Sequence, residues 1–209
     1  MRTPPRPVGP GTPRPGAPRP AASPRAINLV ARVTSILFQP TRQWPEIETE
    51  FSHTATLYKG YIAPLAAIGP VCTAVWLLRF THASVSAAVT SAIASYVLAI
   101  IAVTAIAFVI NVLAPTFGGQ ANTVQALKVA AYASTAWWVG GVFQLVPTLG
   151  VLSIVPGLYS FYLLYTGLPV VMKASTDRAV SYTVTVIVGA LVIWLITGAI
   201  AAAFWPSRL

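Results

Sequence analysis

Three tyrosines are the residues of this chain whose spacing most suggests a chemical role. Tyr159, Tyr162 and Tyr165 recur every three residues inside the apolar stretch SIVPGLYSFYLLYTGLPVVMKAS, which covers residues 153–175. A helix places side chains three apart on one sector of its surface, so the three tyrosines can share one face. A phenolic hydroxyl inside a bilayer costs free energy unless it finds a hydrogen-bond partner. We therefore expect either a buried polar seam between helices or a groove that takes lipid or another ligand.

Two amides in other apolar stretches are candidates for the same seam or groove. Asn111 and Gln144 could bond the tyrosine hydroxyls or the carbonyls that prolines free from helical hydrogen bonding. Replacing Tyr162 with Phe separates the two hypotheses. A seam predicts lost thermal stability in detergent, whereas a groove predicts unchanged stability with altered lipid handling.

The charged residues form no catalytic or metal-binding pattern. No Asp, Glu, Lys, Arg or His lies near the middle of an apolar stretch, whereas pumps and proton-coupled transporters mark their pathways with such residues. His53 has no second ligand at metal spacing, and Cys72 is the single cysteine. The segment FGGQAN lacks the lysine of a phosphate-binding loop. The sequence therefore predicts no enzyme, no cofactor and no catalytic, cofactor-binding or metal site.

Composition places these residues in a membrane protein. Of the 209 residues, 56% are hydrophobic and only 8% are charged, whereas about 25% are charged in a soluble domain. Five apolar stretches approach or exceed the roughly 20 residues that cross a bilayer. They cover about residues 61–79, 86–113, 124–146, 149–172 and 181–204. We predict an all-α integral membrane protein whose five transmembrane helices form a bundle over residues 60–205. Asn122 and Gln125 resemble a capping pair that opens the third span.

The chain before the spans has a different character. Residues 1–24 are rich in proline, glycine and arginine, which predicts a disordered cytoplasmic tail. Residues 25–59 predict amphipathic pre-membrane helices, the first of which ends before Pro40. That helix either lies on the membrane surface or packs on the rest of the protein. The residues expected at the membrane surface are Arg25, Arg32, Trp44, Lys173 and Arg178.

The basic residues beside the spans predict the topology. With the N-terminus inside, most of them are cytoplasmic, and only Arg79 and Arg208 lie outside. The cytoplasmic set is Arg42, Lys59, Lys128, Lys173 and Arg178. Attraction to anionic lipid headgroups also explains the formal charge of +9. We therefore predict a cytoplasmic N-terminus, an exterior C-terminus and no nucleic acid partner.

Six short motifs follow one another along the chain in a familiar order. They are LFQPTRQWPEIETE, LYKGYIAPLAAIGP, FGGQANTVQALKVAAYAS, VPTLG, GLYSFYLLYTGLPVVMKAS and DRAVSYTV. Their order and spacing, over roughly residues 35–204, resemble the Yip-one family of five-span membrane proteins. The resemblance implies a cytoplasmic N-terminus, an exterior C-terminus and a bundle without known catalytic residues. Eukaryotic members are named for interaction with Ypt/Rab GTPases and act in vesicle trafficking as membrane adaptors or bilayer shapers.

The N-terminal region departs from that family. A short Arg/Pro tail replaces a longer cytosolic segment with an acidic Leu-Tyr-Gly-Pro type motif, of which LYKGY at residues 57–61 is a partial echo. Together with the Ala/Arg/Pro/Gly-rich composition, this indicates a bacterial member in the cytoplasmic (inner) membrane, and no Rab-type GTPase partner is assumed. We expect a membrane adaptor or organiser that contacts the lipid bilayer and another membrane protein or itself. The alternative is a passive transporter, channel or lipid scramblase.

Overall fold

The computed structural model describes residues 28–81 and 83–204 of the chain. The predicted disordered tail, residues 1–24, and Arg25 lie outside the described residues. Within the described ranges all regular secondary structure is helical and no strand is present. The predicted all-α class is therefore confirmed.

Four helical segments are long and apolar enough to cross a membrane. They are Thr54–Phe80, Val85–Leu113, Thr148–Val171 and Ala179–Ala203. The second and the fourth are the single helices α6 (Val85–Leu113) and α10 (Ala179–Ala203). Their bounds lie within two residues of the predicted spans 86–113 and 181–204, because each is one unbroken apolar run without an internal proline.

The first of these segments is a chain of short helices. They are α3 (Thr54–Leu57), a π-helical turn over Tyr58–Ile62, α4 (Ala63–Ala66) and α5 (Ile68–Phe80). Pro64 and Pro70 lack the N–H that would continue the helical ladder, and an irregularity precedes each of them. The helix therefore changes its winding beside both prolines and still continues as one segment.

The third predicted span, residues 124–146, is broken. It consists of α7 (Thr123–Ala133), α8 (Thr135–Gly140) and a 3-10 turn over Gly141–Leu145. At the junction of α7 and α8 the Ser134 hydroxyl donates to the Ala130 carbonyl at 2.8 Å, a bond that tends to bend helices. None of the three pieces is long enough to cross a membrane alone, so five spans remain a prediction.

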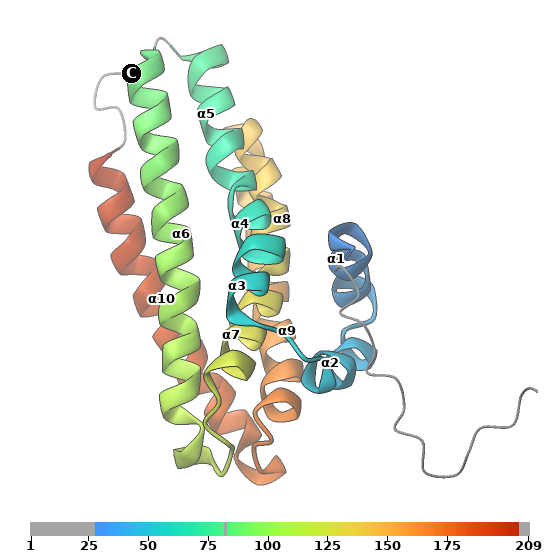
Figure 1. The fold of residues 1–209 in the computed structure, drawn as a ribbon. Helices are drawn as coiled ribbons and strands as arrows, with labels where there is room; N and C mark the ends of the chain where they lie inside the picture. The colour runs from blue at the N-terminus through green and yellow to red at the C-terminus, as the bar shows by residue number, and fades with distance from the viewer. Residues whose placement is uncertain (1–27, 82, 205–209) are drawn as a thin grey trace, which may run out of the picture.

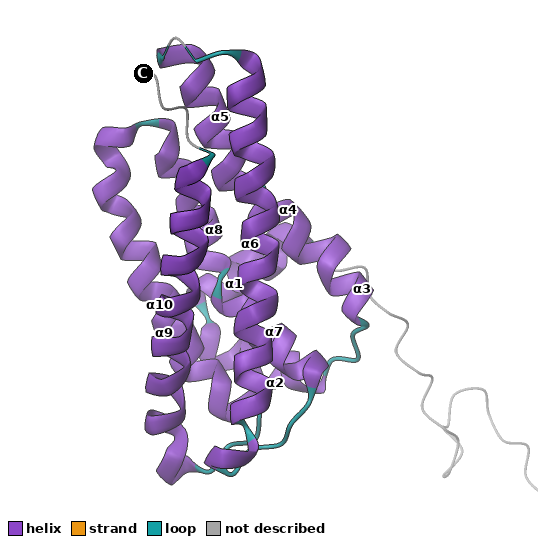
Figure 2. Cartoon of the chain, turned by 90° about the vertical axis from the view of Figure 1, so that its left-hand side faces the viewer, coloured by secondary structure: helices purple, strands orange, loops and turns teal. Residues whose placement is uncertain are grey.

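The long helices run along one common direction, with α7 and α8 between their neighbours (Figure 1). Helix α7 packs on α6 and on α9 (Ile154–Val171), and α6 packs on α5 and α10. A 3-10 turn over Pro147–Ser153 reverses the chain so that α8 and α9 lie side by side. Figure 2 shows α3 and α4 leaving the bundle axis at an angle. The core consequently gathers around α7, where every residue from 126 to 133 is buried.

Two helices before the spans lie beside this bundle (Figure 1). Helices α1 (Leu29–Phe38) and α2 (Pro40–Thr49) are together called the arm here. Asn28 caps α1 by accepting a hydrogen bond from the Ala31 N–H at 3.4 Å. Helix α1 ends before Pro40, as predicted, because Pro40 starts the first turn of α2. The arm packs on α8 and α9.

Candidate functional site

The three tyrosines of α9 do not form the expected buried seam. Tyr159 is partly buried and donates its hydroxyl to the Leu37 carbonyl of α1 at 2.5 Å. Tyr162 and Tyr165 are 44% and 48% exposed. Helix α9 turns other residues toward the bundle, namely Leu163, Leu164, Gly167, Leu168 and Val171. The tyrosine sector therefore borders the arm and the surface, and of the two expected arrangements the exposure of Tyr162 and Tyr165 favours a groove over a buried seam.

The two amides are not joined to the tyrosines. Gln144 accepts a hydrogen bond from the Thr73 hydroxyl, which ties the end of the third predicted span to α5. Its side chain lies against Gly69, where an added Cβ would be 3.3 Å from the Gln144 amide nitrogen. The side-chain oxygen of Asn111 is buried, and no hydrogen-bond partner is found for it among the described residues. Neither amide therefore contacts the tyrosines of α9 through a hydrogen bond.

Arg32 holds the arm together from inside. Its guanidinium donates to the Glu50 carboxylate at 2.5 Å and to the Gln43 side-chain oxygen at 3.1 Å. It also lies 5.9 Å from the centre of the Tyr132 ring on α7. Arg32 was expected at the membrane surface, but its contacts are with the protein. It links α1 to the end of α2 and to the centre of the bundle.

Lys128 is the most deeply buried charged side chain of the described residues, at 2% exposure. Its ammonium donates to the Ile47 carbonyl at 2.8 Å and to the Glu50 carbonyl at 2.5 Å. The last carbonyls of a helix have no partner inside the helix and carry partial negative charge. Nearby, the Gln125 amide donates to the Glu48 carbonyl at 2.8 Å. Helix α7 thus supplies the donors that complete the C-terminal end of α2.

Trp44 anchors the middle of α2 on α9. The indole is 1% exposed, and its N–H donates to the Thr166 hydroxyl at 3.0 Å. The ring lies directly on Gly167, where an added Cβ would be only 2.4 Å from the indole. Trp44 also meets Tyr132 edge to face, with ring centroids 6.5 Å apart. Only glycine at position 167 leaves room for α2 to approach this closely.

Two further cations bind chain segments at the same end of the bundle. Lys173 follows α9 with a φ of 53° and forms an ion pair with Glu48 at 3.0 Å. Arg178 donates to the Thr116 carbonyl at 3.1 Å. A membrane-surface role for these two residues remains a prediction.

Several residues that build the contact between the arm and the bundle were not predicted from the sequence. Tyr61 shares a hydrogen bond of 2.7 Å with Thr135 and packs on Tyr132, with ring centroids 4.5 Å apart. The sequence carried a signal for Lys128, since this lysine lies in a run of small apolar residues, VQALKVAAYAS, that otherwise looks buried. It carried none for Gly167, whose neighbour Trp44 is distant in the chain.

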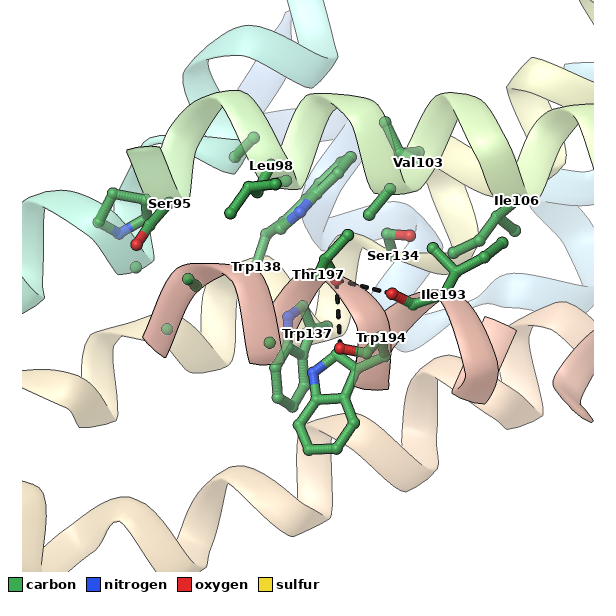
Figure 3. Close-up of a pocket in the computed structure, with 18 of the residues that line it drawn as sticks. Ser95, Leu98, Val103, Ile106, Ser134, Trp137, Trp138, Ile193, Trp194 and Thr197 are labelled. Carbon is green, nitrogen blue, oxygen red and sulfur yellow. Dashed lines mark hydrogen bonds between the residues drawn. The ribbon is translucent and has the colours of Figure 1, made fainter. Parts of the chain in front are cut away.

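Two hollows lie in the bundle, one on each side of a pair of tryptophans. Trp137 and Trp194 meet edge to face with ring centroids 6.2 Å apart. A cavity of about 290 Å³ lies between α5, α6, α8 and α10. Figure 3 shows it flanked by these tryptophans, with the Thr197 hydroxyl turned back to the Ile193 carbonyl at 2.8 Å. A second hollow of about 450 Å³, between α8, α9 and α10, is lined mainly by apolar side chains such as Leu158 and Phe161.

The polar contacts between the arm and the bundle attach the arm to the bundle. No group of three or more His, Cys, Asp or Glu side chains that could hold a metal ion is found among the described residues. The buried polar side chains of the interface bond to backbone carbonyls and to one another. The Arg42 guanidinium and the hydroxyls of Tyr162 and Tyr165, in contrast, have no hydrogen bond or ion pair within the described part of the chain.

Comparison with known proteins identifies one family. The family model described as Yip1 domain matches residues 34–198, from α1 into α10. No curated protein and no solved structure matches the chain. The matched range includes the arm from Thr34 onward, the buried α7 and the tyrosines of α9. The family expectation drawn from the six motifs is confirmed.

Proposed function

Given that this chain belongs to the Yip1 domain family of membrane proteins, we propose that it is a non-enzymatic membrane adaptor or organiser. The arm carries this proposal, because it is fixed to the bundle and still offers a free outer edge. On the arm, Val30 and Phe38 are 71% and 81% exposed, and Phe51, just after α2, is 85% exposed. Large apolar side chains left this exposed favour a contact with a protein or a membrane at this edge.

A rigid arm suits an adaptor better than a mobile one. A segment that becomes ordered only on binding loses conformational entropy at that moment, which weakens the complex. Here Lys128, Arg32 and Trp44 already hold the arm in place. The exposed edge is therefore presented in one orientation, which favours another membrane protein or a second copy of this chain as partner.

Site-specific photocrosslinking in the organism's own membranes tests this proposal. A benzophenone amino acid at Phe51 should form an adduct with one defined protein, and the same protein should be captured from Phe38. The control position is Val89 on α6, which is 47% exposed and should capture lipid. The proposal fails if Phe51 and Phe38 give the same adducts as Val89.

The alternative function, a passive transporter, channel or lipid scramblase, draws on the two hollows beside Trp137 and Trp194. A path for lipid or solute needs such spaces between spans. Liposomes that contain fluorescent lipid and the purified protein separate the two functions in a dithionite-quench assay. The adaptor proposal expects no more lipid translocation than in protein-free vesicles, and clear translocation would replace it with the alternative.

We further propose a bacterial cytoplasmic membrane with the arm on the cytoplasmic side. Support comes from the basic residues, since Lys173 pairs with Glu48 of the arm at the end of α9 and Arg178 follows at the start of α10. Arg79 lies in the last turn of α5, at the opposite end of the bundle (Figure 1). On a Cys72→Ala background, Ser84→Cys should react with an impermeant maleimide in intact cells, and Phe51→Cys only after lysis. The reverse pattern would invert the topology.

A further inference from the structure

The outer corner of the arm, where α1 turns into α2, carries a hollow of about 590 Å³. Its lining residues come from the arm and from α9. They are Phe38, Gln39, Pro40, Thr41, Arg42, Tyr159 and Tyr162. The rings of Tyr159 and Tyr162 lie 5.5 Å apart and form the part that α9 contributes. The hollow thus joins a surface arginine to the tyrosine sector of a candidate membrane-spanning segment.

The arginine at this corner forms no ion pair with the described residues. Arg32, the other arginine of the arm, is paired with Glu50. Arg42 is exposed and has no side-chain partner within the described residues. The nearest carboxylate along α2 belongs to Glu46, which accepts a hydrogen bond from Gln43 at 3.0 Å. The corner therefore presents a free guanidinium, which favours an anionic ligand.

The corner lies just inside the level where the hydrocarbon layer should end. Tyr162 is fourteen residues from Thr148, the start of its segment, which corresponds to about 21 Å at the helical rise. About 30 Å of hydrocarbon reaches near Leu168, beside the glycine on which Trp44 of the arm lies. On α6, about 30 Å of hydrocarbon extends from Val85 to near Thr104, whose hydroxyl bonds the Tyr58 hydroxyl at 2.7 Å. Lys59 follows Tyr58 and is exposed. Two helices therefore place the membrane boundary close to the arm.

From these observations we infer that the corner binds the headgroup of an anionic phospholipid in the leaflet that the arm faces. Arg42 supplies the fork of donors that matches a phosphodiester, and the free hydroxyl of Tyr162 lies beside it. Tyr165, one helical turn further on, is also exposed, and amphipathic rings favour the headgroup level. The hollow opens beside a membrane-spanning helix, which selects a lipid over a free phosphate ion.

Thermal unfolding of the full chain in neutral detergent, titrated with lipid, tests the inference. Phosphatidylglycerol should raise the unfolding midpoint at lower concentration than phosphatidylcholine. Arg42→Gln should raise the half-effect concentration of phosphatidylglycerol about fivefold, the usual contribution of one basic residue at an anionic surface, and leave the phosphatidylcholine curve unchanged. Arg79→Gln, which removes an exposed arginine at the other end of the bundle, should leave both curves unchanged.

Two further measurements keep the test decisive. Tyr162→Phe removes a hydroxyl without a partner in the described chain, so it should fold normally and weaken the phosphatidylglycerol effect about twofold. Inorganic phosphate, used alone as a probe, should produce no shift. Equal responses of the Arg42 and Arg79 variants, an unchanged Tyr162→Phe curve, or a full shift with inorganic phosphate would each overturn the inference. If Arg42→Gln does not fold, Arg42→Lys takes its place, and an unchanged curve would count against the guanidinium contact.

Discussion

Helices α7 and α10 are built on opposite principles. Every residue of α7 from 126 to 133 is buried, and this run includes a lysine. Helix α10 buries only Tyr182, Thr183 and Val186, all near its start. Yet α10 is long and apolar enough to cross a membrane, whereas α7, with 11 residues, is too short to do so alone. In this chain, hydropathy marks the helices that contact lipid, and small residues with a few polar groups mark the helix at the centre.

The physical reason lies in the solvent. Lipid tails are as apolar as leucine, so two apolar faces gain little by meeting each other in a bilayer. Helix α7 is held instead by close approach at small residues such as Ala126 and Ala130, and by the hydrogen bonds of Lys128. Helix α10 is attached mainly at one end, where the Tyr182 hydroxyl bonds the Ile110 carbonyl and its ring stacks on Phe117 at 5.0 Å.

The largest loss of stability should come from removing the buried charge of Lys128 on α7. Lys128→Met keeps most of the aliphatic stem and deletes the donor to the Ile47 and Glu50 carbonyls. Bonds of this kind contribute roughly 1.5–3 kcal/mol each before the cost of burying the ammonium. We expect a loss of about 3 kcal/mol in unfolding free energy, measured by denaturation in detergent micelles.

Lys59→Met is the matched control for that substitution. Lys59 is exposed and has no side-chain partner among the described residues, so its loss should change stability by less than about 0.5 kcal/mol. If the two variants lose the same stability, Lys128 does not act through its buried contacts. The contrast between a bonded centre and a loosely packed periphery would then lose its main support.

Adding a methyl group at one glycine of α9 and at one glycine of α10 compares how tightly the two helices are packed. Gly167→Ala places a methyl group 2.4 Å from the Trp44 ring, so the arm must move away from α9. We expect a loss of about 2 kcal/mol, as for overpacking in a core. Gly198→Ala on α10 meets nothing within 4 Å and should leave stability unchanged or slightly raised. Thermal unfolding and limited proteolysis of the arm provide the measurements.

The two outcomes of that pair are diagnostic. Faster cleavage in the arm of Gly167→Ala alone would show that the arm is released while the bundle stays folded. Equal destabilisation by both alanines would mean that α10 is packed as tightly as α9 and would remove the distinction drawn here.

Much of the architecture could be predicted from the sequence, because it depends on local signals. Unbroken apolar runs gave the bounds of α6 and α10. Pro40 ended α1, and Asn122 was confirmed as a cap, since it accepts hydrogen bonds from the Val124 and Gln125 N–H groups at 3.0 and 3.1 Å. The Gln125 side chain does not return to Asn122. It donates to the Glu48 carbonyl of the arm instead.

The interface of the arm could not be predicted, because its contacts join residues far apart in the sequence. Lys128 bonds carbonyls at positions 47 and 50, and Trp44 requires a glycine at position 167. The sequence also could not predict which way the tyrosine sector of α9 faces. Helix α9 is apolar on all sides, so no polar face indicates which sector turns outward.

The smallest effect in this series tests the tyrosine sector itself. Tyr159→Phe removes the hydrogen bond to the Leu37 carbonyl and should lower the unfolding free energy by about 1 kcal/mol. Tyr162→Phe, its neighbour on the same face, removes a hydroxyl that has no partner in the described chain and should leave stability unchanged. Differential denaturation of the two variants in detergent measures the contrast. Equal losses would restore a buried seam of tyrosines, whereas a loss at Tyr159 alone shows that this sector joins the arm to α9 and leaves Tyr162 free to meet the membrane.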